Sequence, residues 1–218
     1  MSFFKKSNDE QVKAIRPDNL GWLEKKLSDK EMEYLWRCID NRKTSSFKST
    51  LAGNIHESNE LTDTSNWFWI NTLLPLCENY SKEFFNIGKT IPVNQSHPYY
   101  LKSWWVNFQK QNEFNPIHDH TGVYSFVIWM KIPTKHSEQN KNPIALNSNS
   151  RLISLFQFTM IDILGNLLSY SYEMNPKIEG TMLFFPSQLN HSVNPFYNCD
   201  EDRISISGNI SLNTAKTL

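Results

Sequence analysis

The stretch Pro116-Ile117-His118-Asp119-His120-Thr121-Gly122, followed directly by the apolar run Val123–Ile132, decides the fold. In an extended strand, side chains two residues apart point to the same face. His118 and His120 can therefore face one metal ion together, with Asp119 turned away from it. The stretch predicts a strand that carries two metal-binding imidazoles, followed by an apolar strand.

The residues around this stretch repeat the same β-rich texture. Short runs of β-branched and aromatic residues alternate with turn residues from about residue 99 onward. These runs are Tyr100–Gln109, Val123–Ile132, Leu152–Thr159, Leu167–Tyr172, Gly180–Phe185, Ser192–Phe196 and Arg203–Leu212. Leu164-Gly165-Asn166-Leu167 is typical of a hairpin turn between two of them. Because no helical segments separate the runs, they predict an antiparallel sandwich or barrel.

The N-terminal part has a different, helical pattern. Ser28-Asp29-Lys30-Glu31 has the form of a capping box, and apolar residues follow it at helical spacing. A second helix is expected over about 65–85, either kinked at Pro75 or beginning anew there. We therefore expect residues 1–97 to be a helical extension that packs on a core formed by residues 98–218, within one structural domain.

Composition excludes several classes of function. Lys plus Arg and Asp plus Glu both number 22 in 218 residues, so the surplus of cations that nucleic-acid binding needs is missing. The apolar runs are far shorter than the ~20 residues that span a bilayer. Met1–Lys6 is too short and too soon charged for a signal peptide. Cys38, Cys77 and Cys199 form no CxxC and indicate ordinary thiols in a reducing compartment. We expect a cytoplasmic protein that binds neither nucleic acid nor membrane.

Two further candidate residues follow the histidine pair along the chain. His191 comes after the run Gly180–Pro186, and Arg203-Ile204-Ser205 begins the final β-rich run. Taken singly, each signal is weak, since His-x-His pairs are common in loops and Arg203 has acidic neighbours in the sequence. Their order along the chain is more informative than any one of them.

In this order the motifs resemble those of Fe(II)- and 2-oxoglutarate-dependent oxygenases. The resemblance is closest to the group related to prolyl hydroxylases and found in bacteria and phages. It lies in Asn115–His120, in Gly180–Pro186 before His191, and in Arg203–Ile210, and it covers about residues 101–210. It implies a mainly β, α+β fold with a double-stranded β-helix core of the jelly-roll or cupin type, supported by N-terminal helices.

The resemblance also implies a chemistry. The enzyme would be a dioxygenase, most simply a hydroxylase, that couples decarboxylation of 2-oxoglutarate to succinate with oxidation of a small-molecule or peptide substrate. Iron would be held by histidines and a carboxylate on one face. The far carboxylate of 2-oxoglutarate would pair with Arg203 and the hydroxyl of Ser205. Asn107 could contact the cosubstrate, or could be a hydrogen-bonded polar residue at the mouth of the barrel.

One position departs from the family pattern, because His120 stands where Asp or Glu is expected. Three alternatives follow. His118, His120 and His191 could form an all-histidine site, which keeps the strand geometry and is preferred. Asp119 could supply the carboxylate through a bulge. Alternatively the site holds two histidines and no carboxylate, with His118 outside it.

Two other functions are compatible with the pattern. One is a jelly-roll binding or structural module that turns nothing over. The other is a three-histidine, cupin-like metalloenzyme that does not use 2-oxoglutarate. Arg203 and Ser205 distinguish the oxygenase from the cupin-like metalloenzyme, because a cupin that does not use 2-oxoglutarate needs no buried cation at this position. The long polar insertion 133–150 is expected to be disordered or a lid over the site, with His136 in solvent.

Overall fold

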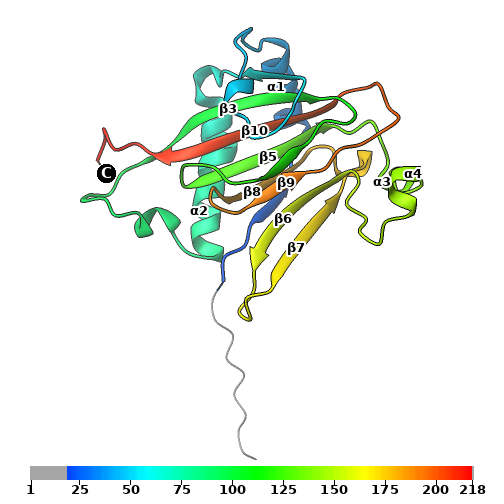
Figure 1. Ribbon diagram of the computed structural model, residues 1–218. Coiled ribbons are helices and arrows are strands. Elements are labelled where there is room, and N and C mark those ends of the chain that lie inside the picture. Colours follow the sequence, from blue (N-terminus) through cyan, green and yellow to red (C-terminus); the bar gives the residue numbers. More distant parts are fainter. Residues whose placement is uncertain (1–18, 218) are drawn as a thin grey trace, which may run out of the picture.

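Two antiparallel sheets form the framework of the computed structural model, which describes residues 19–217 (Figure 1). Met1–Lys6 lies outside the described residues. The larger sheet has the order β1 (Leu23–Lys26), β8 (Thr181–Pro186), β5 (Tyr124–Lys131), β10 (Arg203–Leu212), β3 (Tyr99–Gln109) and β2 (Glu57–Glu60). The smaller has the order β4 (Asn115–His118), β9 (His191–Val193), β6 (Leu155–Ile161) and β7 (Leu167–Glu173). The predicted mainly β fold with a double-stranded β-helix core is confirmed.

The apolar run at β5 shows why the sequence folds this way. Phe126 and Ile128 belong to an apolar cluster that β5 shares with the N-terminal helices. Val127 and Trp129 point the other way, into a second cluster that includes Phe156 of the smaller sheet. Because both faces of β5 are covered, its central residues Phe126–Met130 are a continuous apolar run without polar alternation.

Helices α1 (Asp29–Asp40) and α2 (Leu74–Glu83) contribute to the helix-side cluster. The capping box is confirmed, since Ser28 and Glu31 exchange both hydrogen bonds at the start of α1. A π-helical turn, η3 (Trp69–Leu73), leads directly into α2, and Pro75 lies in the first turn of α2, where a proline is tolerated. The short helices are η1 (Lys48–Thr50), η2 (Thr64–Asn66), η4 (Ile87–Thr90), α3 (His136–Gln139), α4 (Pro143–Leu146) and η5 (Pro176–Ile178).

The N-terminal part is not purely helical, because it also supplies both edges of the larger sheet. β1 pairs with β8, and β2 pairs with β3. Both strands are only four residues long and carry charged side chains, which is how natural edge strands avoid further pairing. A division of the chain at residues 97 and 98 stays a prediction, and a core of residues 98–218 alone would lack these two edges.

The insertion 133–150 differs from its prediction. It holds α3 and α4, and no residue of this segment lines the cavity described below. His136 is 6% exposed and lies 3.4 Å from a carboxylate oxygen of Glu173, so the expectation of a solvated histidine was wrong. The segment packs near the end of β7, away from the position of a lid. Among the helices of the described residues, none is both long and apolar enough to span a bilayer.

Candidate metal centre and cavity

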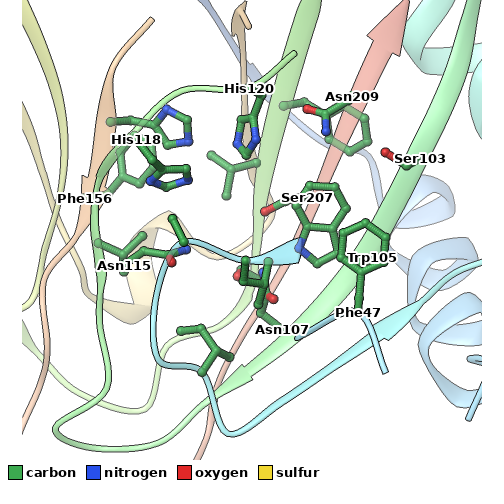
Figure 2. Close-up of a pocket in the computed structure, with 18 of the residues that line it drawn as sticks. Phe47, Ser103, Trp105, Asn107, Asn115, His118, His120, Phe156, Ser207 and Asn209 are labelled. Atoms are coloured by element: carbon green, nitrogen blue, oxygen red, sulfur yellow. The ribbon is translucent and has the colours of Figure 1, made fainter. Parts of the chain in front are cut away.

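Three histidines meet at the smaller sheet, two of them on its neighbouring strands β4 and β9. His118 ends β4 and lies opposite His191, the first residue of β9, while His120 follows two residues after His118. One ring nitrogen from each histidine lies within 4.8 Å of the other two. Figure 2 shows His118 and His120 side by side at one wall of a cavity. The structure therefore brings together all three histidines that the sequence singled out.

Backbone carbonyls orient two of these rings. Nδ1 of His118 lies 2.8 Å from the carbonyl oxygen of Pro116, and Nδ1 of His191 lies 2.9 Å from that of Leu189. A carbonyl oxygen only accepts, so each Nδ1 carries the proton and each Nε2 keeps its lone pair free. This arrangement is how proteins commonly fix a metal-binding imidazole.

The environment keeps two of the rings neutral. Burial lowers the pKa of His120 to about 4, and the neighbouring His118 acts in the same direction. Burial lowers the pKa of His191 to about 3, with His118 and His120 contributing further. Both imidazoles are thus unprotonated at neutral pH, the form in which histidine binds a metal ion.

Asp119 lies between the two histidines of the pair and is exposed. It lines the edge of the cavity, but the group of side chains that could hold one ion contains His118, His120 and His191 and, within the described residues, no carboxylate. His120 lies two residues beyond the end of β4, and it joins His118 and His191 in this group, whereas Asp119 does not. An all-histidine donor set is chemically suited to iron, zinc, copper or nickel.

The histidines line a cavity of about 350 Å³ between the two sheets. Its floor is one face of β3 and β10, where polar side chains stand opposite one another in register. These pairs are Arg203–Gln109, Ser205–Asn107, Ser207–Trp105 and Asn209–Ser103. At about 3.3 Å per residue, the row is roughly 20 Å long. The floor is long enough to take a small dicarboxylate at one end and leave room at the other.

Arg203 is the buried cation of this cavity. It is 2% exposed, donates weakly to the carbonyl oxygen of Asn194 at 3.4 Å and to Oγ of Ser154 at 3.2 Å, and lies over the ring of Phe196. Its Nε has no hydrogen-bond partner, and no carboxylate of the described residues forms an ion pair with it. Burial lowers its pKa to about 9, so it remains charged at neutral pH.

The interpretation of Arg203 as a surface charge offset by neighbouring acids is therefore wrong. Glu201, one of those acids, pairs instead with Lys131 at 2.6 Å. A charge buried without a partner is costly unless a ligand supplies one. An anion that entered this end of the cavity would find a buried cation without an ion-pair partner among the described residues.

Three other residues that line the cavity have a buried polar atom without a protein partner: Nε1 of Trp105, Oδ1 of Asn107 and Oδ1 of Asn115. Trp105 is 3% exposed, and its ring stacks on Phe47 with centroids 4.4 Å apart. Figure 2 shows Trp105 and Phe47 across the cavity from His118 and His120. The sequence indicated Trp105 only as core or pocket wall, and no sequence pattern could show that its N–H is unpaired.

The N-terminal loop supplies a wall that sequence reasoning missed. Phe47, Leu51 and Ile55 lie between the two N-terminal helices, in a stretch for which the sequence suggested no site residue, and all three line the cavity. Their spacing of four residues was the available signal. The loop is tied to the turn before β4 by two backbone hydrogen bonds between Asn54 and Phe114 and by a bond from His56 N–H to Glu113.

Comparison with known proteins adds a family to this geometry. Residues 103–209 match the sequence model of a family described as "Putative 2OG-Fe(II) oxygenase". The matched segment begins in β3 and ends in β10, so it includes the cavity floor and all three histidines. No curated protein sequence matches the chain.

Solved structures with this fold include a prolyl-4-hydroxylase of Pseudomonas putida, 12% identical, with a TM-score of 0.54 over 89% of this chain and 94% of that one. The viral collagen prolyl hydroxylase of Paramecium Bursaria Chlorella virus-1, solved as its 2OG complex, is 12% identical, with a TM-score of 0.47 over 87% and 94%. HygX of Streptomyces hygroscopicus, solved with nickel, 2-oxoglutarate and hygromycin B, is 9% identical, with a TM-score of 0.48 over 89% and 84%. At such identities the first of these shows a shared fold and no more.

Proposed function

Because residues 103–209 belong to the 2OG-Fe(II) oxygenase family, we propose that the protein is an Fe(II)- and 2-oxoglutarate-dependent dioxygenase, a hydroxylase by reaction. The observation that carries the proposal is the buried, unpaired Arg203 in the same cavity as the three-histidine cluster. A cupin-like metalloenzyme without this cosubstrate would give no reason to bury a cation there.

His118, His120 and His191 are the residues that would hold Fe(II). Three imidazoles on one side of an ion leave open positions on the other side for cosubstrate and oxygen. When bound, the iron supplies the oxygen-activating redox chemistry of the reaction. The hydrogen bonds at the Nδ1 atoms of His118 and His191 hold the rings in the ligating orientation.

Arg203 would bind the far carboxylate of 2-oxoglutarate. Its guanidinium offers a forked donor that matches a carboxylate, and its unpartnered Nε would gain an acceptor. Ser205 and Asn107 stand opposite each other one pair further along the floor and would add neutral contacts to the same ligand. The charge of the bound dicarboxylate would then neutralise the buried cation.

The apolar walls would exclude water from the reacting end. Phe156 and Phe185 approach the His191 ring with centroids 5.8 and 5.0 Å away, and Phe185 is fully buried. On the other side Trp105 lies 6.1 Å from His120. Exclusion of bulk water protects a reactive intermediate and strengthens the electrostatic contacts within the site.

We expect the purified protein, reconstituted with Fe(II), to convert 2-oxoglutarate to succinate slowly even without a substrate. Anaerobic addition of 2-oxoglutarate should produce a weak visible absorption band. Succinate is measured by chromatography and the band by spectrophotometry. Absence of both signals from a protein shown to contain iron would overturn the proposal and favour the binding module that turns nothing over.

We expect Trp105→Phe to weaken 2-oxoglutarate binding about 10-fold, because it keeps an aromatic side chain against Phe47 and removes the unpaired N–H donor. Hydrogen bonds to charged groups contribute about 1.5–3 kcal/mol. Calorimetry on the metal-loaded protein measures the change. Trp104→Phe is the matched control, since Trp104 points into the helix-side core and stacks on Phe68. Equal affinities in the wild type and Trp105→Phe would contradict this role.

The substrate is proposed to be a small molecule or a peptide. The net charge is zero, and the far half of the cavity floor carries the polar residues Ser103, Ser207 and Asn209, while Lys102 and Asp119 also line the cavity. A hydroxylase substrate bound there would be recognised by hydrogen bonds and by the aromatic wall, and Lys102 and Asp119 would add charged contacts. A cytoplasmic location stays a prediction.

A further inference from the structure

The β6–β7 hairpin carries a large apolar surface on the outside of the molecule. Six of its side chains are between 47% and 81% exposed: Ile161, Ile163, Leu164, Leu167, Leu168 and Tyr170. Apolar residues gathered at the surface in this way are typical of a protein–protein contact, because the largest apolar patch on a typical monomer is only ~300–600 Å² and is often functional. A stable interface buries ~800 Å² on each partner.

The outer strand of the hairpin is an unprotected edge. β7 is the last strand of the smaller sheet, and its ladder to β6 runs without a register shift from Leu167 to Glu173. Natural edge strands are usually blunted by Pro, Lys or a bulge. The sequence Leu-Leu-Ser-Tyr-Ser-Tyr-Glu of β7 has no Pro, no Lys and a single charge at its end. β1 and β2 are protected in a way that β7 is not.

The hydrogen bonds of β6 show which amides of β7 point outward. Thr159 donates its N–H to Asn190, on the β9 side, and Asp162 donates to Asn166 across the hairpin turn. In an antiparallel ladder, pairs that exchange hydrogen bonds alternate with pairs that do not. Thr159 and its partner Ser169 form a non-bonded pair, so the N–H and C=O groups of Ser169 point away from β6. By the same alternation those of residues 167, 171 and 173 do so too.

We propose that a second copy of this chain pairs antiparallel with β7 about a two-fold axis at Tyr170. This axis places Ser169 opposite Ser171 and Leu167 opposite Glu173 of the other copy, so that outward-pointing backbone groups meet each other. Tyr170, whose backbone groups point toward β6, meets itself as a non-bonded pair, where side chains come closest. The strand is therefore complementary to itself in both backbone and register.

The side chains of β7 support a second copy over another partner. With this axis, Leu168 stands opposite Tyr172 twice, and Tyr170 faces Tyr170. Aromatic pairs and aromatic–aliphatic pairs across strands are stabilising. This face of β7 already packs on Trp22 through Tyr170, and on Trp129 through Tyr172. The second copy would continue that aromatic surface, and a patch without charges offers nothing to a charged partner.

A second apolar group lies where the hairpin tip of the other copy would arrive. His136 of α3 contacts Glu173 at the end of β7, and Figure 1 shows α3 and α4 beside that end, opposite the hairpin tip. On α4, Ile144 and Leu146 are both at least 60% exposed. Antiparallel pairing directs the tip of each hairpin toward this end of the other copy.

The interface leaves the candidate metal centre untouched. No residue from 161 to 175 lines its cavity. The oligomeric state therefore tests this inference independently of whether the protein is an oxygenase.

Sedimentation velocity on the full chain is expected to show a dimer at micromolar concentration. Leu168→Lys and Ser169→Pro should shift it to monomer, because the first adds like charges near the axis and the second removes an outward N–H. Ile70→Lys is the matched control, since Ile70 is similarly exposed but lies on η3, and it should remain dimeric. Circular dichroism verifies that each variant is folded. A monomeric wild type, or a dimer that survives both changes in β7, would overturn the proposal.

A cross-link tests the register itself. In a Cys199→Ser background, where the remaining Cys38 and Cys77 are buried, Tyr170→Cys should form an intermolecular disulfide on mild oxidation. Cα atoms in a non-bonded pair are about 4.5 Å apart, within the range of a disulfide. Ile163→Cys is the control variant: Ile163 is more exposed than Tyr170, yet on this axis it lies at the hairpin tip, roughly 30–40 Å from its counterpart. Equal cross-linking of the two variants, or none in Tyr170→Cys, would contradict the axis.

Discussion

Arg203→Met is expected to weaken binding of 2-oxoglutarate at least about 30-fold while making the protein more stable. The guanidinium is buried and has no ion-pair partner in residues 19–217, so the fold bears the cost of desolvating it. Loss of a cation that pairs with a ligand carboxylate costs about 2–5 kcal/mol, which is about 30- to 4,000-fold in affinity. Methionine fills a similar volume without the charge, and such replacements are neutral or stabilising by about 1–4 kcal/mol.

Both halves of this prediction are measurable on the same sample. Calorimetric titration of the metal-loaded protein gives the affinity, and thermal unfolding gives the stability, with about 2–4 °C expected per kcal/mol at this chain length. Arg37→Met is the matched control, because Arg37 is an exposed residue of α1. A variant that binds 2-oxoglutarate like the wild type would remove the basis of the proposed function.

His191→Ala is expected to lose metal binding far more completely than Asp119→Ala. His191 is buried at the centre of the cluster, with both other rings within 5.0 Å of its own. Loss of a ligand should exceed the ~10–100-fold that loss of a supporting hydrogen bond to a ligand costs. Asp119 is exposed and outside the cluster, so its removal should cost less than about 10-fold.

Titration with Fe(II) under anaerobic conditions measures the ranking, and Co(II) provides a spectroscopic check of the ligand geometry. His56→Ala serves as the control, because His56 is an exposed histidine of the N-terminal loop. A larger loss of Fe(II) affinity in Asp119→Ala than in His191→Ala would exclude the all-histidine ligand set. It would favour the alternative in which Asp119 supplies a carboxylate ligand.

Much of the site could be predicted because it depends on the period of a strand. Side chains two apart share a face, so His118 pairs with His120 and Arg203 with Ser205 without knowledge of the tertiary structure. β10 begins and ends at the predicted residues, Arg203 and Leu212. The capping box at Ser28 is equally local, since both of its hydrogen bonds lie within four residues.

The rest depends on contacts between residues far apart in the sequence. β2 is a polar tetrapeptide that no apolar pattern marks, and it becomes a strand only because β3 offers it an edge. His136 is buried by β7 and by its own short helix. The unpaired N–H of Trp105 is a property of everything around it. The periodicity of apolar residues does not predict such features, because they depend on how the sheets and loops pack together.

The order of strands in the larger sheet has a consequence for how the protein is made. Leu23 pairs with Phe184, and Trp105 pairs with Ser207. Strands that are synthesised early can therefore pair only after their partner strands near the C-terminus have been synthesised. At about 5–20 residues per second, synthesis separates these partners by several seconds. Sheets dominated by such distant pairings fold on the order of milliseconds to seconds once complete. During translation the nascent apolar strand β5 has neither β8 nor β10 beside it, and this interval is when the chain most needs a chaperone.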